Sequence, residues 1–199
     1  YFSLFVLTAF LAGVALSVLG LFILRPVAIL MGAKGEMLDF AVRYGRVLMV
    51  SVPTFILQNM FQSFFVTAEK PTLGFWFTVG AGCTNMVLDL VLVGVLRGGV
   101  AGAASATVIS QLVGGIGPML YFANRKNTSL LRFVRPKFSA KALGKACANG
   151  SSELMTNLSA SLVSALYNLQ LMKLIGADGV AAYGVLMYVG FIFAAVFIG

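Results

Sequence analysis

Thr84-Asn-Met-Val-Leu-Asp-Leu90 lies inside an apolar run, residues 72–96, that is long enough to cross a bilayer. The run carries one charged residue, Asp89, and a charge at that depth is costly unless it is paired, hydrated or neutralised. Asn85 precedes Asp89 by four residues, so both side chains lie on one face of a helix. An amide beside a carboxylate suits a site that takes up a proton or a small cation. A purely structural hydrogen bond is the alternative.

Composition predicts the class of fold. The chain is 60% hydrophobic and 10% charged, its mean hydropathy is +0.98, and its apolar residues come in long runs. These values are typical of an all-α polytopic membrane protein. The net charge of +8 could indicate nucleic acid, but the basic residues lie between the apolar runs. Lipid headgroups and membrane topology explain basic residues at those places better.

The apolar runs predict six membrane-spanning helices. Their approximate ranges are 4–30, 44–67, 72–96, 100–122, 146–175 and a last one from 180 that the sequence truncates. Pro53 lies inside the second helix, where we expect it to kink the axis and to free a backbone carbonyl that a neighbouring helix or water must satisfy. The chain has no initiator Met and stops in an apolar run at Gly199, so we expect it to be part of a longer protein.

A long basic connection divides the chain. Residues 125–145 carry seven of the fourteen Lys and Arg residues and no acidic residue. Such an excess is typical of a cytoplasmic loop. We therefore predict four helices of one bundle in residues 1–124, a cytoplasmic link in 125–145, and the start of a second bundle in 146–199. The turns at 97–99 and 176–179 then face outside.

A polar stripe runs along the predicted fifth helix. Its members recur at spacings of four, four, three and four: Glu153, Asn157, Ser161, Ser164 and Asn168. One helix face that is polar over this length would be unfavourable against lipid, so it should face other helices or water. Packing through interhelical hydrogen bonds is the ordinary explanation for Ser and Asn. The additional carboxylate of Glu153 favours a water-lined pathway.

The second helix has a group of amides near Pro53. Gln58 and Gln62 share one face, and Asn59 lies beside them. We expect these three side chains to line a substrate cavity or to pair helices, and the sequence leaves both readings open.

Enzymatic signatures are missing from the sequence. It has no His, no phosphate-binding Gly loop with a Lys, and two Cys, which lie in or next to apolar helices. We therefore expect neither an enzyme nor a cofactor, and no metal site apart from Na⁺ at Asp89 or Glu153. Transport driven by an ion gradient is the natural energy source.

Three stretches resemble one family. Asn85-Met-Val-Leu-Asp89, Gly99-Val-Ala-Gly-Ala-Ala-Ser-Ala-Thr107-Val-Ile-Ser-Gln111 and Gly176-Ala-Asp-Gly-Val-Ala-Ala-Tyr183 are similar to the multidrug and toxic compound extrusion (MATE) transporters. The resemblance covers essentially the whole chain. It implies two six-helix bundles, of which this chain matches the third helix through part of the eighth, with the basic loop as the link.

The resemblance also implies roles for single residues. Tyr44, Asn85, Asp89 and Thr107 match the family's cation or proton site in the first bundle. Glu153 matches an acidic residue of a second proposed cation site. The helices that would complete both sites lie outside these 199 residues.

The sequence therefore predicts part of a secondary exporter in a bacterial plasma membrane. It would exchange H⁺ or Na⁺ for small, mostly cationic organic compounds by alternating access, with membrane lipid as its surroundings and no nucleic acid or protein partner implied. Two alternatives stay open: a lipid-linked oligosaccharide flippase of the same superfamily and a non-transporting scaffold subunit. The driving ion, the substrates and the oligomeric state cannot be read from the sequence.

Overall fold

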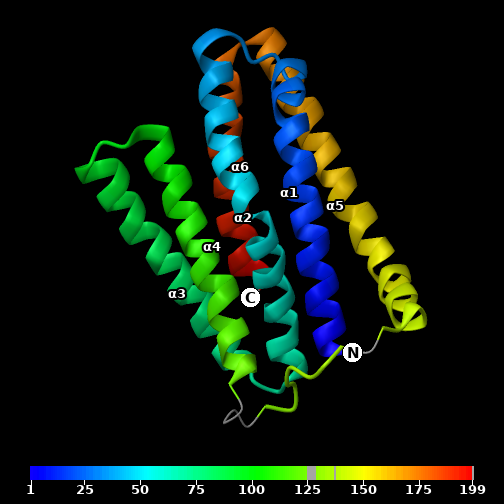
Figure 1. The fold of residues 1–199 in the computed structure, drawn as a ribbon. Coiled ribbons are helices and arrows are strands. Elements are labelled where there is room, and N and C mark those ends of the chain that lie inside the picture. The colour runs from blue at the N-terminus through cyan, green and yellow to red at the C-terminus, as the bar shows by residue number, and fades with distance from the viewer. Residues whose placement is uncertain (125–128, 137, 199) are drawn as a thin grey trace.

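The computed structural model describes residues 1–124, 129–136 and 138–198, and every regular element of that part is a helix (Figure 1). The elements are α1 (Phe2–Leu30), α2 (Gly35–Thr67), α3 (Pro71–Asp89), the π-helical segment η1 (Leu90–Val95), α4 (Gly99–Ala123), α5 (Ala140–Leu174) and α6 (Ala177–Ile198). The predicted all-α class is confirmed.

Two helices begin earlier than predicted. Helix α2 starts at Gly35 instead of residue 44, with Glu36 in its first turn, where a carboxylate is favourable beside free backbone N–H groups. Helix α5 starts at Ala140 instead of residue 146, because Ser139 caps it by accepting a hydrogen bond from the backbone N–H of Ala142 at 3.3 Å. The last part of the predicted basic loop is therefore helical, and residues 125–128 and 137 of that loop lie outside the described residues.

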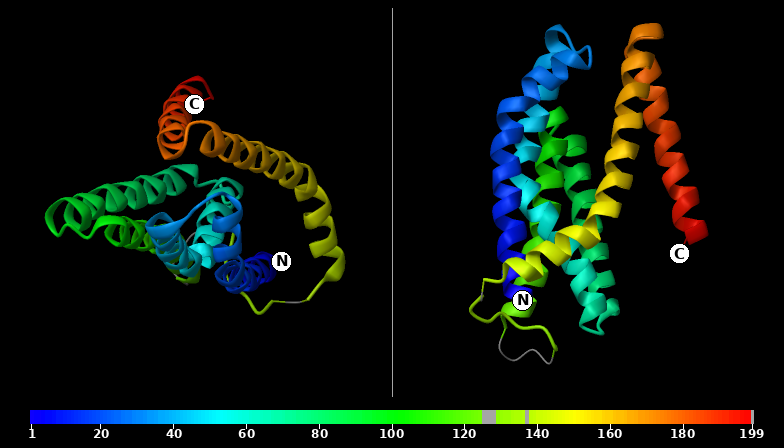
Figure 2. Two further views of the ribbon diagram at one scale, coloured as in Figure 1. Left: turned by 90° about the horizontal axis from the view of Figure 1, so that it is seen from above. Right: turned by 90° about the vertical axis from the view of Figure 1, so that its right-hand side faces the viewer.

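The helices form two groups. We call α1–α4 with η1 the first body, in which α1 packs on α2, α2 on α4, and α4 on α3. We call α5 and α6 the second body, because they pack mainly against each other and stand apart from the rest (Figure 2). The basic stretch joins the two at the end where the chain begins.

Aromatic rings form the core of the first body at that same end. Phe61 and Phe65 face inward one helical turn apart on α2, and both are almost completely buried. The ring of Phe122 from α4 lies 5.7 Å from that of Phe61 and 5.0 Å from that of Phe65. Phe2 of α1 and Phe133 of the connection complete the cluster, with their rings 4.9 Å apart.

Helix α2 is bent near its middle (Figure 1), and Pro53 lies inside it. Proline has no N–H to give to the carbonyl of Met49, four residues earlier. The hydroxyl of Ser17 on α1 donates to that carbonyl instead, as the sequence led us to expect of a neighbouring helix.

Two glycines hold the bent region of α2 between α1 and α4. A Cβ on Gly13 of α1 would lie 2.7 Å from Cα of Pro53, and one on Gly115 of α4 would lie 2.7 Å from the carbonyl oxygen of Thr54. Small residues at such positions let helices approach closely in a membrane. The helices α1, α2 and α4 therefore meet as one tightly packed unit.

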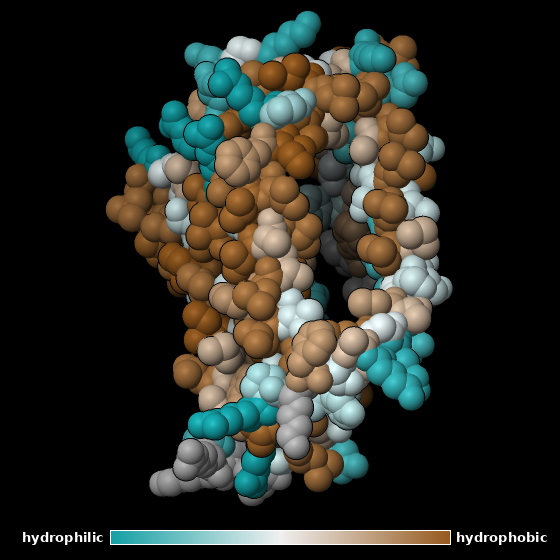
Figure 3. All heavy atoms as spheres, turned by 45° about the vertical axis from the view of Figure 1, so that its right-hand side comes forward, coloured by the Kyte–Doolittle hydropathy of each residue, from teal (hydrophilic) through white to brown (hydrophobic). Residues whose placement is uncertain are grey.

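Within the part of the chain that the structure describes, four helical segments are long and apolar enough to cross a membrane: α1, α2, α3 continued by η1, and α4. On the face shown in Figure 3, apolar atoms form a broad band, with hydrophilic atoms gathered at its two ends. Helix α5, with 35 residues, is long enough but carries the polar stripe, and it does not reach the same hydropathy. A fifth span therefore stays a prediction.

Candidate functional site

Asp89 is the last residue of α3, directly before η1. Asp89 and Asn85 are both half-buried. The wider π turn shifts the helix beyond Asp89, and the N–H of Leu96 bonds back five residues to the carbonyl of Val91 at 2.9 Å. Single π turns are frequent at functional sites in helices.

Asp89 and Thr107 lie at nearly the same height in the hairpin of α3 and α4. Phe77 of α3 and Gly117 of α4 lie side by side, because a Cβ on Gly117 would lie 2.8 Å from the ring of Phe77, so heights along both helices can be counted from this contact. From there Asp89 is twelve residues along α3, about 18 Å, and Thr107 is ten residues back along α4, about 15 Å. The two helices are antiparallel, so the heights differ by only about 3 Å.

Tyr44 of α2 belongs to the same layer. Helices α2 and α4 run in parallel and touch where Thr54 meets Gly115. Tyr44 lies ten residues before Thr54, about 15 Å, and Thr107 lies eight residues before Gly115, about 12 Å. All three side chains are half-buried. By this count along the helices, the three predicted residues lie at similar heights in the first body, and we call this level the layer.

Hydrogen bonds within this layer are local. The hydroxyl of Thr107 donates to the carbonyl of Ala103 at 3.0 Å. Among the described residues, no hydrogen bond or ion pair reaches the carboxylate of Asp89, and Asn85 does not donate to it. One turn beyond Thr107, the side-chain oxygen of Gln111 is buried without a hydrogen-bond partner. The layer therefore holds oxygen atoms that a small cation or a proton could engage.

The amides of α2 turn toward different neighbours. Gln58 packs against α4 so closely that a Cβ on Gly114 would lie 2.6 Å from its Cδ. The Nε2 of Gln62 donates to the hydroxyl of Thr78 on α3 at 2.8 Å. Asn59 donates to the carbonyl of Phe55 on its own helix at 2.9 Å. Gln58 and Gln62 thus pair helices within the first body, while a place in a substrate cavity stays untested.

The polar stripe of α5 divides into two parts. Glu153 and Asn157 are exposed and linked, since Nδ2 of Asn157 donates to Oε1 of Glu153 at 3.1 Å. Ser161 is exposed between the two parts. Ser164 and Asn168 are half-buried and line a cavity of about 440 Å³ against α6.

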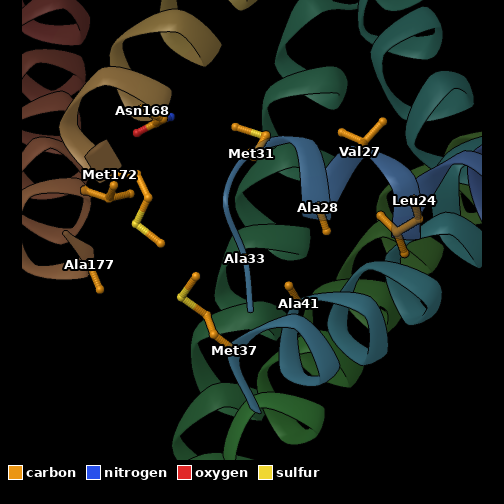
Figure 4. Close-up of a pocket in the computed structure, with 11 residues that line it drawn as sticks. Leu24, Val27, Ala28, Met31, Ala33, Met37, Ala41, Asn168, Met172 and Ala177 are labelled. Atoms are coloured by element: carbon orange, nitrogen blue, oxygen red, sulfur yellow. The ribbon is translucent and has the colours of Figure 1, made fainter. Parts of the chain in front are cut away.

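A second cavity, of about 400 Å³, lies between the two bodies. It is lined by the turn between α1 and α2 and by the ends of α5 and α6 that meet it (Figure 4). Met31, Met37 and Met172 extend into it, and Asn168 contributes the amide. Next to it the bodies touch, because a Cβ on Gly32 would lie 3.3 Å from Cγ of Met172. Elsewhere α5 stands off from the first body across a hollow (Figure 3).

Sequence reasoning missed this contact and its methionines. Met31 and Met37 lie in the predicted turn between the first two helices, where an apolar side chain has no periodic pattern to mark it. Met172 lies in the last turn of the predicted fifth helix, and nothing in the sequence indicates which helix it faces. Thr78, the partner of Gln62, was missed as well, although its position in an apolar run was a usable signal. No group of three or more His, Cys, Asp or Glu within the described residues could hold a metal ion.

The comparisons with known proteins agree on one family. The family model described as MatE matches residues 1–91. The chain is similar to a protein named multidrug export protein MepA of Staphylococcus saprophyticus, with 30% identity over 126 residues, which is 62% of this chain and 28% of that protein. A protein of the same name from Staphylococcus aureus is 23% identical over 177 residues, covering 87% of this chain and 39% of its own length.

Solved structures share the fold. A structure described as the inward-facing conformation of a multidrug resistance MATE family transporter has a TM-score of 0.81 and 23% identity, and the match covers 89% of this chain and 41% of that one. A MOP superfamily transporter of Pyrococcus furiosus also has a TM-score of 0.81, with 22% identity, 96% of this chain and 42% of its own. The chain thus spans less than half the length of these relatives.

Proposed function

Because the chain belongs to the MATE family, we propose that its 199 residues serve an exporter of small organic compounds that is driven by a cation gradient. The protein is an integral membrane protein, and its helices and its bacterial relatives agree with a bacterial plasma membrane. Relatives of this chain are named multidrug export proteins, and we propose small organic compounds, mostly cationic, as its substrates.

The arrangement of two bodies supports this proposal most strongly. They touch at one end, beside the cavity of Met31, Met37 and Met172, and a hollow separates them elsewhere. Two rigid groups with one small contact can exchange that contact for another by rocking, which is how many transporters alternate access. We assign the basic stretch to the cytoplasm, so the methionine-lined contact closes the outer end.

We propose that the layer of Tyr44, Asp89 and Thr107 binds the driving H⁺ or Na⁺, with Asn85 one turn from Asp89. Its support is the common height of these side chains and a half-buried carboxylate on which no hydrogen bond or ion pair converges among the described residues. A proton or Na⁺ would neutralise this charge inside the membrane. The close packing of α4 on the bent part of α2 offers a route by which that neutralisation could change helix packing around Pro53.

Glu153 and Asn157 form the proposed second site, on the second body. Their hydrogen bond fixes the carboxylate along the polar face of α5. The same face of α5 continues with Ser161, Ser164 and Asn168. We propose that this face lines the substrate path, together with the amides of α2, Gln58, Asn59 and Gln62. The flippase alternative is less favoured, because no Arg of the described residues lines either of the two cavities at α5 and α6.

Efflux measurements test the coupling site. The full-length protein is reconstituted in vesicles, and dye export is followed under an imposed proton gradient and, separately, an imposed Na⁺ gradient. Asp89→Asn should abolish gradient-driven export, because the amide is nearly isosteric but cannot change its charge. Asp178→Asn, an exposed position in the first turn of α6, is the matched control and should retain export.

Two results would contradict the proposal. Wild-type export by Asp89→Asn, with unchanged thermal unfolding, would remove Asp89 from the coupling site. A wild-type protein that exports no dye under either gradient would favour the scaffold alternative.

A further inference from the structure

The connection between the two bodies is fixed to the first body over its described first part. The backbone N–H of Val134 donates to the hydroxyl of Ser3 on α1 at 2.9 Å. The ring of Phe133 lies 4.9 Å from that of Phe2, in the aromatic cluster. Ser129, at the start of the same stretch, is only 5% exposed. The segment 129–134 therefore packs on the first body as part of it.

An apolar cavity of about 530 Å³ lies under this segment. It is lined by the first turns of α1, by Leu57 of α2, by the end of α4 and by the connection itself. Ser3 contributes the hydroxyl, and most of the remaining lining is aliphatic or aromatic. Leu7 and Phe10 form its exposed side, at 46% and 43% exposure. The volume is within the range of ordinary ligand pockets.

A second, more polar cavity of about 670 Å³ adjoins the first. Val134 lines both, and Tyr1, Arg135 and Ser139 supply the polar groups of the second. Arg135 is exposed, and the stretch 125–145 around it has no acidic residue. An apolar chamber thus opens next to a cationic one at the end of membrane-spanning helices.

We propose that the two cavities together bind one anionic phospholipid, with an acyl chain in the apolar cavity and the phosphate at Arg135. A guanidinium is the side chain best matched to phosphate, through paired N–H donors. Basic segments at a cytoplasmic membrane surface attract anionic lipids. Asp89 lines neither cavity.

Other occupants fit less well. A lipophilic cation would meet the basic connection, which repels it. A second copy of the chain would bring two such connections face to face, and like charges disfavour that pairing. An anionic amphiphile satisfies both the apolar lining and the charge.

Lipid titration of the full-length protein tests the site. Native mass spectrometry in detergent measures binding of phosphatidylglycerol and of phosphatidylcholine with identical acyl chains. Phosphatidylglycerol should bind about fivefold more tightly, and Arg135→Gln should remove that preference. Arg46→Gln changes an exposed arginine of α2 that lines neither cavity, so it is the matched control and should keep the preference.

Filling the cavity separates the acyl-chain part from the headgroup part. Ala123→Phe and Leu7→Trp place a ring into the apolar cavity from exposed positions, and each should weaken the binding of both lipids at least tenfold. Ala148→Phe, exposed on α5, should change neither. Thermal unfolding verifies that each variant is folded.

Three outcomes would overturn the proposal. Equal binding of the two lipids by the wild type would exclude the selection of an anionic headgroup at Arg135. Unchanged binding by both folded cavity variants would mean that another part of the protein or a second copy fills the space. Loss of preference in Arg46→Gln as well as in Arg135→Gln would reduce the effect to net charge.

Discussion

Ser17→Ala should destabilise the protein through one backbone carbonyl. The hydroxyl of Ser17 donates to the carbonyl of Met49, which Pro53 leaves without its helical partner. Ser17 is 8% exposed, and no water from the bilayer can replace the lost donor. The substitution removes a single oxygen atom, so loss of packing contributes little.

The magnitude follows from the environment of that carbonyl. An unsatisfied buried backbone group costs about 1–3 kcal/mol, whereas interhelical hydrogen bonds in membranes average about 0.6 kcal/mol with a maximum near 1.7. We therefore expect a loss of about 1–2 kcal/mol in the free energy of unfolding. For a folded unit of 150–250 residues this lowers the unfolding midpoint by about 2–8 °C.

A double-mutant cycle isolates the effect. Pro53→Ala restores an N–H that can bond to Met49, so Ser17→Ala should cost about 1 kcal/mol less in that background. Ser110→Ala is the matched control: Ser110 is 6% exposed, and its hydroxyl donates to Thr107, whose carbonyl already has a helical partner. It should cost less than about 0.5 kcal/mol.

Thermal unfolding of the full-length protein in detergent measures all four variants. Equal costs of Ser17→Ala with and without Pro53 would refute the reasoning, because the hydroxyl would then contribute something other than satisfaction of the freed carbonyl. Equal costs of Ser17→Ala and Ser110→Ala would refute it in the same way.

Two further predictions concern packing. Gly115→Ala should lower the unfolding midpoint by about 2–10 °C, because its Cβ would press on the backbone of α2. Gly80→Ala is the control, since a Cβ there has open space, and it should change the midpoint by less than about 2 °C. Equal shifts of the two variants would contradict the close approach of α4 to α2. Phe133→Ala should let trypsin cleave the connection at least tenfold faster than in the wild type, because the ring of Phe133 packs on that of Phe2. Phe138→Ala, at an 80% exposed position, should leave the cleavage rate unchanged. Equal cleavage rates of the two variants would mean that the ring of Phe133 does not hold the segment.

The helices were predictable because membrane-spanning runs are continuous and local in the sequence. Pro53 even predicted a freed carbonyl, but its donor lies 32 residues earlier on another helix, and no local pattern encodes that pairing. The start of α5 was missed because the basic residues around it predicted a loop, whereas the side chain of Ser139 caps a helix there. The η1 segment after Asp89 has the same composition as an ordinary apolar helix, so its π turn leaves no mark in the sequence.

The candidate site was predictable to the extent that it follows helical spacing. Glu153 and Asn157 stand four residues apart, and their hydrogen bond is the direct result. The contact of Met172 with the turn at Gly32 required knowledge of how the two bodies meet, which depends on a long connection and not on periodicity.

The fixed first part of the connection also limits how the second body can travel. Val134 is bonded to Ser3 and α5 begins at Ala140, so the chain between them is six Cα–Cα steps long, with a reach of about 20 Å. The 35-residue α5 is about 52 Å long, so a tilt of only 10° about that corner would carry its far tip about 9 Å. Displacement is therefore amplified along this lever, and the largest excursion falls on the methionine-lined end.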